Sequence, residues 1–277
     1  MTQPHDHSHG ELEDHDLGLS HDLPRIVERN GLGRRGMLGL FGGLGVAALA
    51  GCAGSDDTST GSSATSSAAG EIPEETAGPF PADGSNGVNV LTESGVVRSD
   101  ITASFGSASG VADGVPMTIR MKVYDLDGED ATVLAGAAVY VWHCDRDGEY
   151  SMYSDTVGDE NYLRGVQEAD ADGVVEFTSI FPACYAGRWP HIHFEVYRSL
   201  AEATSAGSKL RTSQIAIPQD VCEEVYGGAE GYDQSVTNLA QVSLDSDMVF
   251  ADGHSLQLGK VTGSLDEGYT IALNVPV

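Results

Sequence analysis

Apolar and polar side chains alternate in the run Pro190-His191-Ile192-His193-Phe194-Glu195-Val196-Tyr197. Successive side chains of a β-strand point to opposite faces, so Ile192, Phe194 and Val196 are predicted to face a core. His191 and His193 then lie side by side on the opposite face. Two neutral imidazoles in this arrangement can bind one metal ion, although the same pair also fits a polar, solvated face.

Similar β-favouring runs, broken by Gly, Asp and Asn, recur from residue 71 onward with little helical periodicity. The clearest are Met117–Tyr124, Ala137–Trp142, Val174–Ile180, His191–Tyr197, Thr212–Ile217 and Tyr269–Val275. Turns are predicted at 125–128, 145–148 and 170–173, and short helical turns at 161–168 and 218–226. Many short strands at this spacing predict an all-β domain, a β-sandwich of mainly antiparallel strands with long loops.

The chain is strongly acidic. Its 277 residues carry a formal net charge of -28, from 14 basic and 42 acidic residues. Such a surface repels phosphate backbones, so nucleic-acid binding is not expected. It also repels anionic lipids, so any membrane attachment requires a covalent anchor. The acidity suits a protein that stays soluble outside the cell.

Residues 1–52 have the features of an export signal. A His- and Asp-rich leader over 1–22 is predicted to be disordered, although such a tract can also bind metal. Arg34-Arg35 then precedes an apolar stretch, Gly36 to Gly51, that is too short for a convincing transmembrane helix. The stretch ends in Leu49-Ala50-Gly51-Cys52, which resembles a bacterial lipobox. These features predict twin-arginine export and a lipid on Cys52 as the only membrane contact, on the outer face of the cell membrane.

The segment after Cys52 has a different composition. Residues 53–70 are almost entirely Ser, Thr, Gly, Ala and Asp, which predicts a flexible tether. The folded domain is therefore expected over residues 71–277, in a compartment where disulfides form. It contains Cys144, Cys184 and Cys222, so one disulfide and one free thiol are expected, with the pairing left open.

Two segments upstream of the histidine pair each place a tyrosine just after a turn, at Tyr150 and Tyr185. The domain has no His-Glu-x-x-His motif and no paired cysteine spacing, so a zinc protease or a structural zinc site is not indicated. The other two histidines of the domain, His143 and His254, are expected to be ordinary surface or loop residues. Trp142 is expected in the core.

Three motifs together resemble the intradiol ring-cleavage dioxygenases, which include catechol 1,2-dioxygenase and the protocatechuate 3,4-dioxygenase subunits. They are Trp-x-x-Asp-x-x-Gly-x-Tyr at 142–150, Pro-x-x-Tyr at 182–185 and Arg-x-Pro-His-Ile-His-Phe at 188–194. Two weaker matches support them. Thr76-Ala77-Gly78-Pro79-Phe80 is similar to a family entry segment, with Ala77 in place of the usual acid, and Arg98-Ser99-Asp100-Ile101 is similar to a second segment.

The resemblance implies a β-sandwich with one non-haem ferric ion per chain, bound by Tyr150, Tyr185, His191 and His193. These residue types suit the ion, since Fe(III) prefers anionic oxygen donors and a coordinated tyrosine ionises well below its usual pKa of about 10. The implied reaction uses dioxygen to cleave a catechol between its hydroxyls and gives a cis,cis-muconate-type diacid. Tyr150 or Tyr185 would accept a substrate proton as a general base, and Arg188 would stabilise the anionic ring.

Two other interpretations compete with this one. An inactive extracellular β-sandwich that binds iron or an aromatic ligand would keep the His pair, but it does not explain why all four ligand types and Arg188 persist. An extradiol-type site would use the two histidines, Glu195 and Fe(II). That site leaves both tyrosines without a role.

Overall fold

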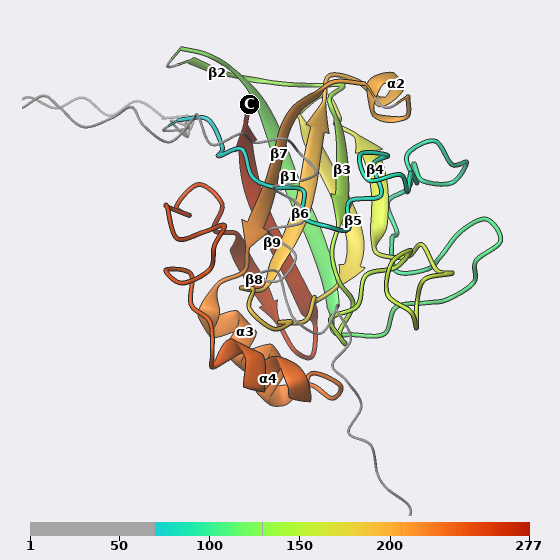
Figure 1. The fold of residues 1–277 in the computed structure, drawn as a ribbon. Coiled ribbons are helices and arrows are strands. Elements are labelled where there is room, and N and C mark those ends of the chain that lie inside the picture. Colours follow the sequence, from blue (N-terminus) through green and yellow to red (C-terminus); the bar gives the residue numbers. More distant parts are fainter. Residues whose placement is uncertain (1–69, 129, 206) are drawn as a thin grey trace, which may run out of the picture.

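A computed structural model describes residues 70–277, apart from residues 129 and 206, and shows two facing β-sheets with two helices at one end and a short helix at the other (Figure 1). The predicted leader, signal and tether therefore lie outside the described residues. No helix of the described part is long and apolar enough to cross a bilayer. The elements are β1 Pro116–Asp127, β2 Asp130–Val133, β3 Ala138–Trp142, β4 Arg164–Glu168, β5 Val174–Ile180, β6 His191–Tyr197, α2 Leu200–Ala203, β7 Lys209–Ala216, α3 Gln219–Gly228, α4 Asp233–Leu239, β8 Lys260–Ser264 and β9 Gly268–Pro276.

The two sheets have different orders. The four-stranded sheet runs β4-β3-β6-β7, and all of its pairs are antiparallel. The five-stranded sheet runs β2-β1-β9-β8, with β5 also paired to β1. Its central pair, β1 with β9, is parallel, with Met117 opposite Tyr269 and Val123 opposite Val275. The predicted sandwich of mainly antiparallel strands is confirmed.

The main hydrophobic core fills the space between the sheets. The strand β6 contributes Ile192, Phe194 and Val196, all fully buried, as the alternation of its sequence predicted. They pack with the inward residues of the other sheet, among them Ile119, Met121, Ile271 and Val275. Burial of each such side chain contributes about 1.5–3 kcal/mol, which fixes the register of β6 and leaves His191 and His193 on the outer face.

A second cluster covers that outer face. We call residues 71–97 the N-terminal strap, and Figure 1 shows this teal stretch crossing the four-stranded sheet. Its apolar residues, Ala82, Val90, Leu91 and Val96, pack on Tyr140 and Trp142 of β3. Its backbone is tied down at both sheets, since Ile72 donates to Pro276 and Glu75 to Thr212. The strap thus covers the face that carries the two histidines.

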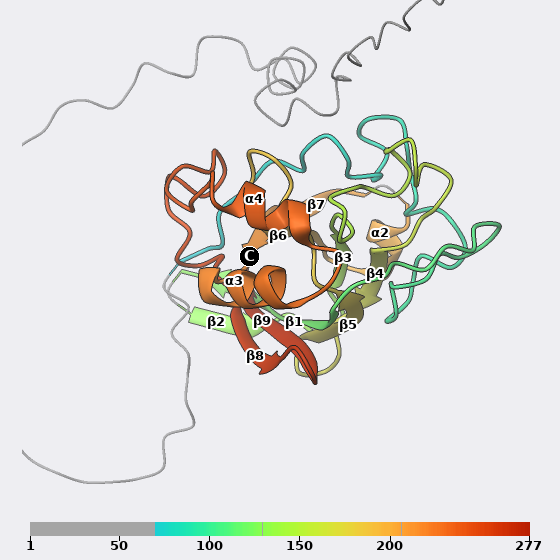
Figure 2. The ribbon, with the colours of Figure 1, turned by 90° about the horizontal axis from the view of Figure 1, so that it is seen from below.

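The helices α3 and α4 pack together at one end of the sandwich, as the view from below shows (Figure 2). The helix α3 buries Cys222, Val225 and Tyr226 against the main core. It begins directly after Pro218, within the range where a helical turn was predicted. That prediction is confirmed, whereas the one at 161–168 is wrong, since residues 164–168 form β4.

Candidate metal centre

The centre of the outer face is the histidine pair of β6. In the four-stranded sheet His193 lies opposite Trp142 of β3 and opposite Gln214 of β7. The indole of Trp142 stacks on the imidazole of His193, with 4.9 Å between ring centroids and 5° between planes. Trp142 is buried as expected, and its packing fixes the orientation of the His193 ring.

The Nε2 atoms of His191 and His193 are 3.1 Å apart. The Nδ1–H of His191 donates to the carbonyl of Trp189, which leaves the lone pair on Nε2 directed into the site. Burial lowers the pKa of both imidazoles well below the ordinary value, so both are neutral at physiological pH. Metal bonds to imidazole are about 2.1 Å long, so two ligands of one ion have this separation.

The two tyrosines approach the pair from different loops. Tyr185, between β5 and β6, places its hydroxyl 3.4 Å from Nε2 of His191. Tyr150, between β3 and β4, lies edge-on to Tyr185 and to His193, with ring centroids 5.9 and 6.2 Å away. Gly148 allows these loops to approach, because a Cβ there would lie 3.2 Å from Cβ of Tyr185 and its φ is +89°.

The polar atoms of this group are not satisfied by one another. The Tyr150 hydroxyl is buried and has no hydrogen-bond partner, while Tyr185 and His193 both crowd the single lone pair of His191 Nε2. A buried hydroxyl without a partner is costly, and one cation would engage all four donors at once. The residues present therefore fit a metal ion.

Burial also raises the pKa of both phenols, that of Tyr150 well above its ordinary value and that of Tyr185 to about 12. Without a cation both are protonated at neutral pH. A cation bound to both phenols would therefore have to displace two phenolic protons, which a hard trivalent ion does better than a divalent one.

The extradiol alternative fails on geometry. Glu195 is fully buried, but one of its oxygens accepts from Lys209 and the other from the Tyr197 hydroxyl, each at 2.6 Å. No three side chains of the His, Cys, Asp and Glu types in the described ranges are placed to hold a metal ion. The donors that converge in the described part are the two histidines and the two tyrosines.

Arg188 lies beside this donor set. Its guanidinium is buried, with Nη1 3.4 Å from Nε2 of His191. Nε donates to Asp247 at 2.9 Å, and Nη2 donates to Gln214 at 2.6 Å. The five residues predicted for the site are therefore together, and two further residues fix the orientation of the arginine.

Comparison with known proteins agrees with this arrangement. A family model described as Dioxygenase matches residues 98–192, a range that contains both tyrosines, Arg188 and His191. Chlorocatechol 1,2-dioxygenase of Rhodococcus opacus is 43% identical over 72 residues, 26% of this chain and 27% of that protein. Catechol 1,2-dioxygenase 2 of Acinetobacter lwoffii is 30% identical over 129 residues, 40% of this chain and 43% of that protein. This chain therefore spans less than half of the length of either relative.

A solved structure matches over a larger part. The intradiol ring-cleavage dioxygenase from Tetranychus urticae superposes with a TM-score of 0.58 and 22% identity, over 75% of this chain and 94% of that chain. Residues 98–192 are therefore similar to the dioxygenase family, and the fold is similar to that of this intradiol ring-cleavage dioxygenase.

The weaker intradiol motifs also have places in the structure. Gln214 donates to the carbonyl of Thr76, and Gly78 packs so closely that a Cβ there would lie 3.3 Å from Cε1 of His193. The ring of Phe80 lies 5.0 Å from that of Tyr150. The Thr76–Phe80 segment therefore forms a wall of the centre. Arg98 instead bonds to carbonyls of a nearby loop and is structural.

One expectation was partly right and another was wrong. His143 lies in the loop after β3, one of the two expected places, but it is buried, because its ring bonds the carbonyl of Cys144 and the hydroxyl of Ser179 in β5. Cys144, Cys184 and Cys222 are all free and buried, so no disulfide links the three. Burial raises the pKa of each thiol, which keeps it protonated and unreactive.

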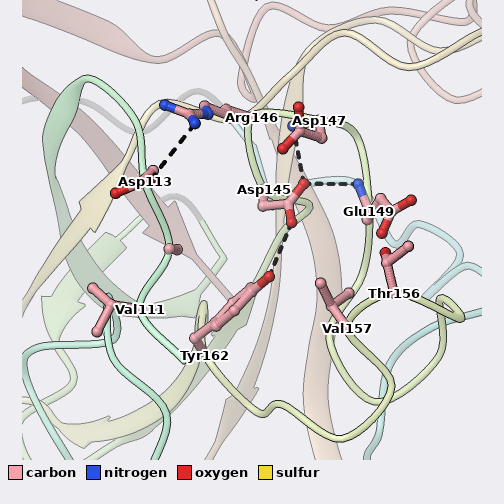
Figure 3. Close-up of a pocket in the computed structure, with 10 residues that line it drawn as sticks. Val111, Asp113, Asp145, Arg146, Asp147, Glu149, Thr156, Val157 and Tyr162 are labelled. Carbon is pink, nitrogen blue, oxygen red and sulfur yellow. Dashed lines mark hydrogen bonds and ion pairs between the residues drawn. The ribbon is translucent and has the colours of Figure 1, made fainter. Parts of the chain in front are cut away.

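Behind the loop that carries Tyr150 lies a cavity of about 350 Å³ (Figure 3). Its lining includes Asp113, Asp145, Arg146, Asp147 and Tyr162, but none of the four donors. Asp145 accepts from the backbone of Asp147 and Glu149 and from the Tyr162 hydroxyl, as Figure 3 shows. These bonds shape the turn before Tyr150. The residues that line the cavity therefore support the loop of Tyr150, and the cavity is not part of the four-donor site.

Proposed function

We propose that the protein is a non-haem Fe(III) dioxygenase that cleaves a catechol between its two hydroxyls with O2 and releases a cis,cis-muconate-type diacid. The observation that carries this proposal is the convergence of Tyr150, Tyr185, His191 and His193 around one point, with the Tyr150 hydroxyl left without a partner. The alternative of an inactive binding protein gains no support from any feature of the site.

The four donors would hold one ferric ion per chain. When bound, that ion would supply Lewis-acid chemistry that makes a catechol reactive toward O2. Both histidines stay neutral because of burial, so all of the anionic charge comes from the two tyrosines. This leaves the tyrosines as the side chains that exchange protons during turnover.

An arriving catechol has two protons to lose. A phenolate of Tyr150 or Tyr185 accepts one of them at its Oη, acting as the general base, and a solvent hydroxide accepts the other. Burial raises the pKa of each phenol, so either phenolate would accept a proton readily. The protein thereby converts a neutral substrate into the dianion that reacts.

Arg188 stabilises that anion. Its guanidinium is held by Asp247 and Gln214 and keeps Nη1 directed at the donor set. A fixed positive group in a buried site stabilises developing negative charge without reorganisation. The Thr76–Phe80 wall lies against His193 and Tyr150 and would limit the access of water to the reacting ring.

The reaction is tested with the iron-loaded full chain, catechol and 18O2. The proposal predicts oxygen uptake and a muconate-type diacid that carries both 18O atoms. A product cleaved beside the two hydroxyls, or no oxygen uptake with iron bound, would contradict it. Tyr185→Phe serves as the control, because it removes one donor while the fold is retained.

The place of action is a separate proposal. Arg34-Arg35, the apolar stretch and Cys52 support export in the folded state and a lipid anchor at Cys52. Cell fractionation of the wild type and of Cys52→Ala tests this. Release of only the variant from the membrane fraction supports the anchor, and an equal distribution of the two argues against it.

A further inference from the structure

Arg164, the first residue of β4, is a buried cation without an anionic partner. Its side chain is 1% exposed, and the ion pairs among the described residues do not include it. All of its hydrogen-bond acceptors are neutral oxygens. Removing such a charge from water costs free energy, so the hydrogen bonds that hold the guanidinium must offset that cost.

The guanidinium joins three separate parts of the chain. Nη1 donates to the carbonyls of Phe80 and Pro81, at 2.9 and 3.3 Å, and to the hydroxyl of Tyr140 at 3.2 Å. Nη2 donates to the carbonyl of Ser151 at 2.9 Å, and Nε donates to its hydroxyl at 3.1 Å. One side chain thus connects the strap, β3 and the loop that follows Tyr150.

Both of the loop segments that Arg164 joins flank Tyr150. Ser151 is the next residue, and the ring of Phe80 packs on the Tyr150 ring at 5.0 Å. The backbone nearby is strained, since Met152 and Leu163 have φ values of +70° and +55°. Bulky residues adopt such values only where the surroundings impose them. The phenol is therefore held in place from both sides through a single guanidinium.

We propose that Arg164 is a positioning residue for Tyr150, which clamps the strap and the 150–154 loop so that the Tyr150 hydroxyl stays directed at His191, His193 and Tyr185. The proposal rests on the proposed function where it treats Tyr150 as an iron ligand. A lysine would keep the charge, but its single ammonium cannot span acceptors that lie on both sides of a planar fork.

Arg98 provides a matched control. It is also a guanidinium bound mainly by backbone carbonyls, those of Arg164 and Asn161, and it lies over the ring of Phe105. It contacts neither Phe80 nor Ser151. Arg98→Lys therefore removes a comparable set of bonds, two of them to the Arg164 carbonyl, and leaves every bond of the Arg164 guanidinium in place.

The experiment compares Arg164→Lys with Arg98→Lys in the full chain, first without metal. The amide of Ala82 donates to the Tyr153 hydroxyl and that of Tyr153 to the Tyr150 carbonyl, so both report on the clamped segments. Hydrogen exchange at both amides should accelerate at least about tenfold in Arg164→Lys and stay near the wild-type rate in Arg98→Lys. Equal acceleration in both variants, or none in either, would overturn the proposal.

The second readout is the visible band per bound iron. Arg164→Lys should bind iron but show a weakened or shifted tyrosinate band, while Arg98→Lys matches the wild type. An unchanged band in Arg164→Lys would overturn the positioning role.

A wild type that binds iron without a band overturns the proposed function instead, and the exchange data then decide on the clamp alone. If Arg164→Lys does not fold, Tyr140→Phe removes the acceptor of one Arg164 bond, together with the bond that the Tyr140 hydroxyl donates to the Pro81 carbonyl. This variant should accelerate exchange at the same two amides to a smaller extent.

Discussion

The guanidinium of Arg188 and the carboxylate of Asp247 form a fully buried ion pair, with 2.9 Å between Nε and Oδ2. The same oxygen accepts from the backbone of Trp189, and the other carboxylate oxygen accepts from Val249 and Phe250. Asp247 lies beyond the range that the family model matches. The orientation of a residue in the family motif therefore depends on the C-terminal part of this chain.

Asp247→Asn should affect both stability and ligand binding. Removing one partner of a buried ion pair costs about 3–5 kcal/mol, since it leaves the other charge uncompensated. Arg188 would also lose its orientation, so catechol should bind the iron-loaded protein more weakly under nitrogen. Urea unfolding and anaerobic titration measure the two effects. Asp245→Asn, at an exposed position nearby, is the control, and identical behaviour of the two variants would refute the orienting role.

Gly78→Ala should perturb the centre without unfolding the protein. Gly78 has a φ of +71° and faces His193, while Gly106 has a φ of +72° with nothing within 4 Å. Alanine in this backbone region costs about 1–2 kcal/mol at either position. Only Gly78→Ala should lower catechol turnover, on the order of tenfold, because only there does the new methyl group press on a ligand. Equal turnover in both variants would place the Thr76–Phe80 wall outside the site.

His143 should make the metal-free protein sensitive to acid. Burial lowers its pKa from 6.5 to about 4 in the folded state. Above pH 6.5 the imidazole is neutral in both the folded and the unfolded state, so its burial is not opposed by a charge. As the pH falls toward 4 only the unfolded state takes up a proton, and the free energy of unfolding decreases by about 3 kcal/mol. The stability difference between the wild type and His143→Gln should therefore shrink from pH 7 to pH 4. Urea unfolding measures it, with His254→Gln as the control. A difference that stays constant with pH would show that the ring does not titrate in this way.

The strands that the sequence predicted are the ones with strong packing patterns. In β1, β5 and β6 apolar residues alternate or run continuously and face the main core, so local pattern and tertiary packing agree. The segment Arg164–Glu168 contains helix-favouring residues, and pairing with β3 overrides that preference. The short strands β2 and β8 are largely exposed, so they carry no hydrophobic pattern. The parallel pairing of β1 with β9 joins distant parts of the chain and is not encoded locally.

The residues that would bind the metal were predictable because motifs with fixed spacing carry them. The residues that orient them were not. Gln214, Asp247 and Arg164 come from β7, from a loop beyond α4 and from β4, and each reaches the centre only through the fold. In the sequence, these residues could have been noticed only as polar side chains at positions where a buried residue is expected. Asp247 does not stand out among 42 acidic residues, and Arg164 belongs to none of the motifs.

We propose above that Tyr150 and Tyr185 bind a ferric ion together with the two histidines. The most direct test is the visible absorption spectrum of the iron-loaded full chain, with iron quantified in the same sample. We predict an intense tyrosinate-to-iron band at about one iron per chain, which shifts when catechol is added under nitrogen. A protein that binds iron and stays colourless would show that the tyrosines are not ligands, and would contradict the proposed metal site.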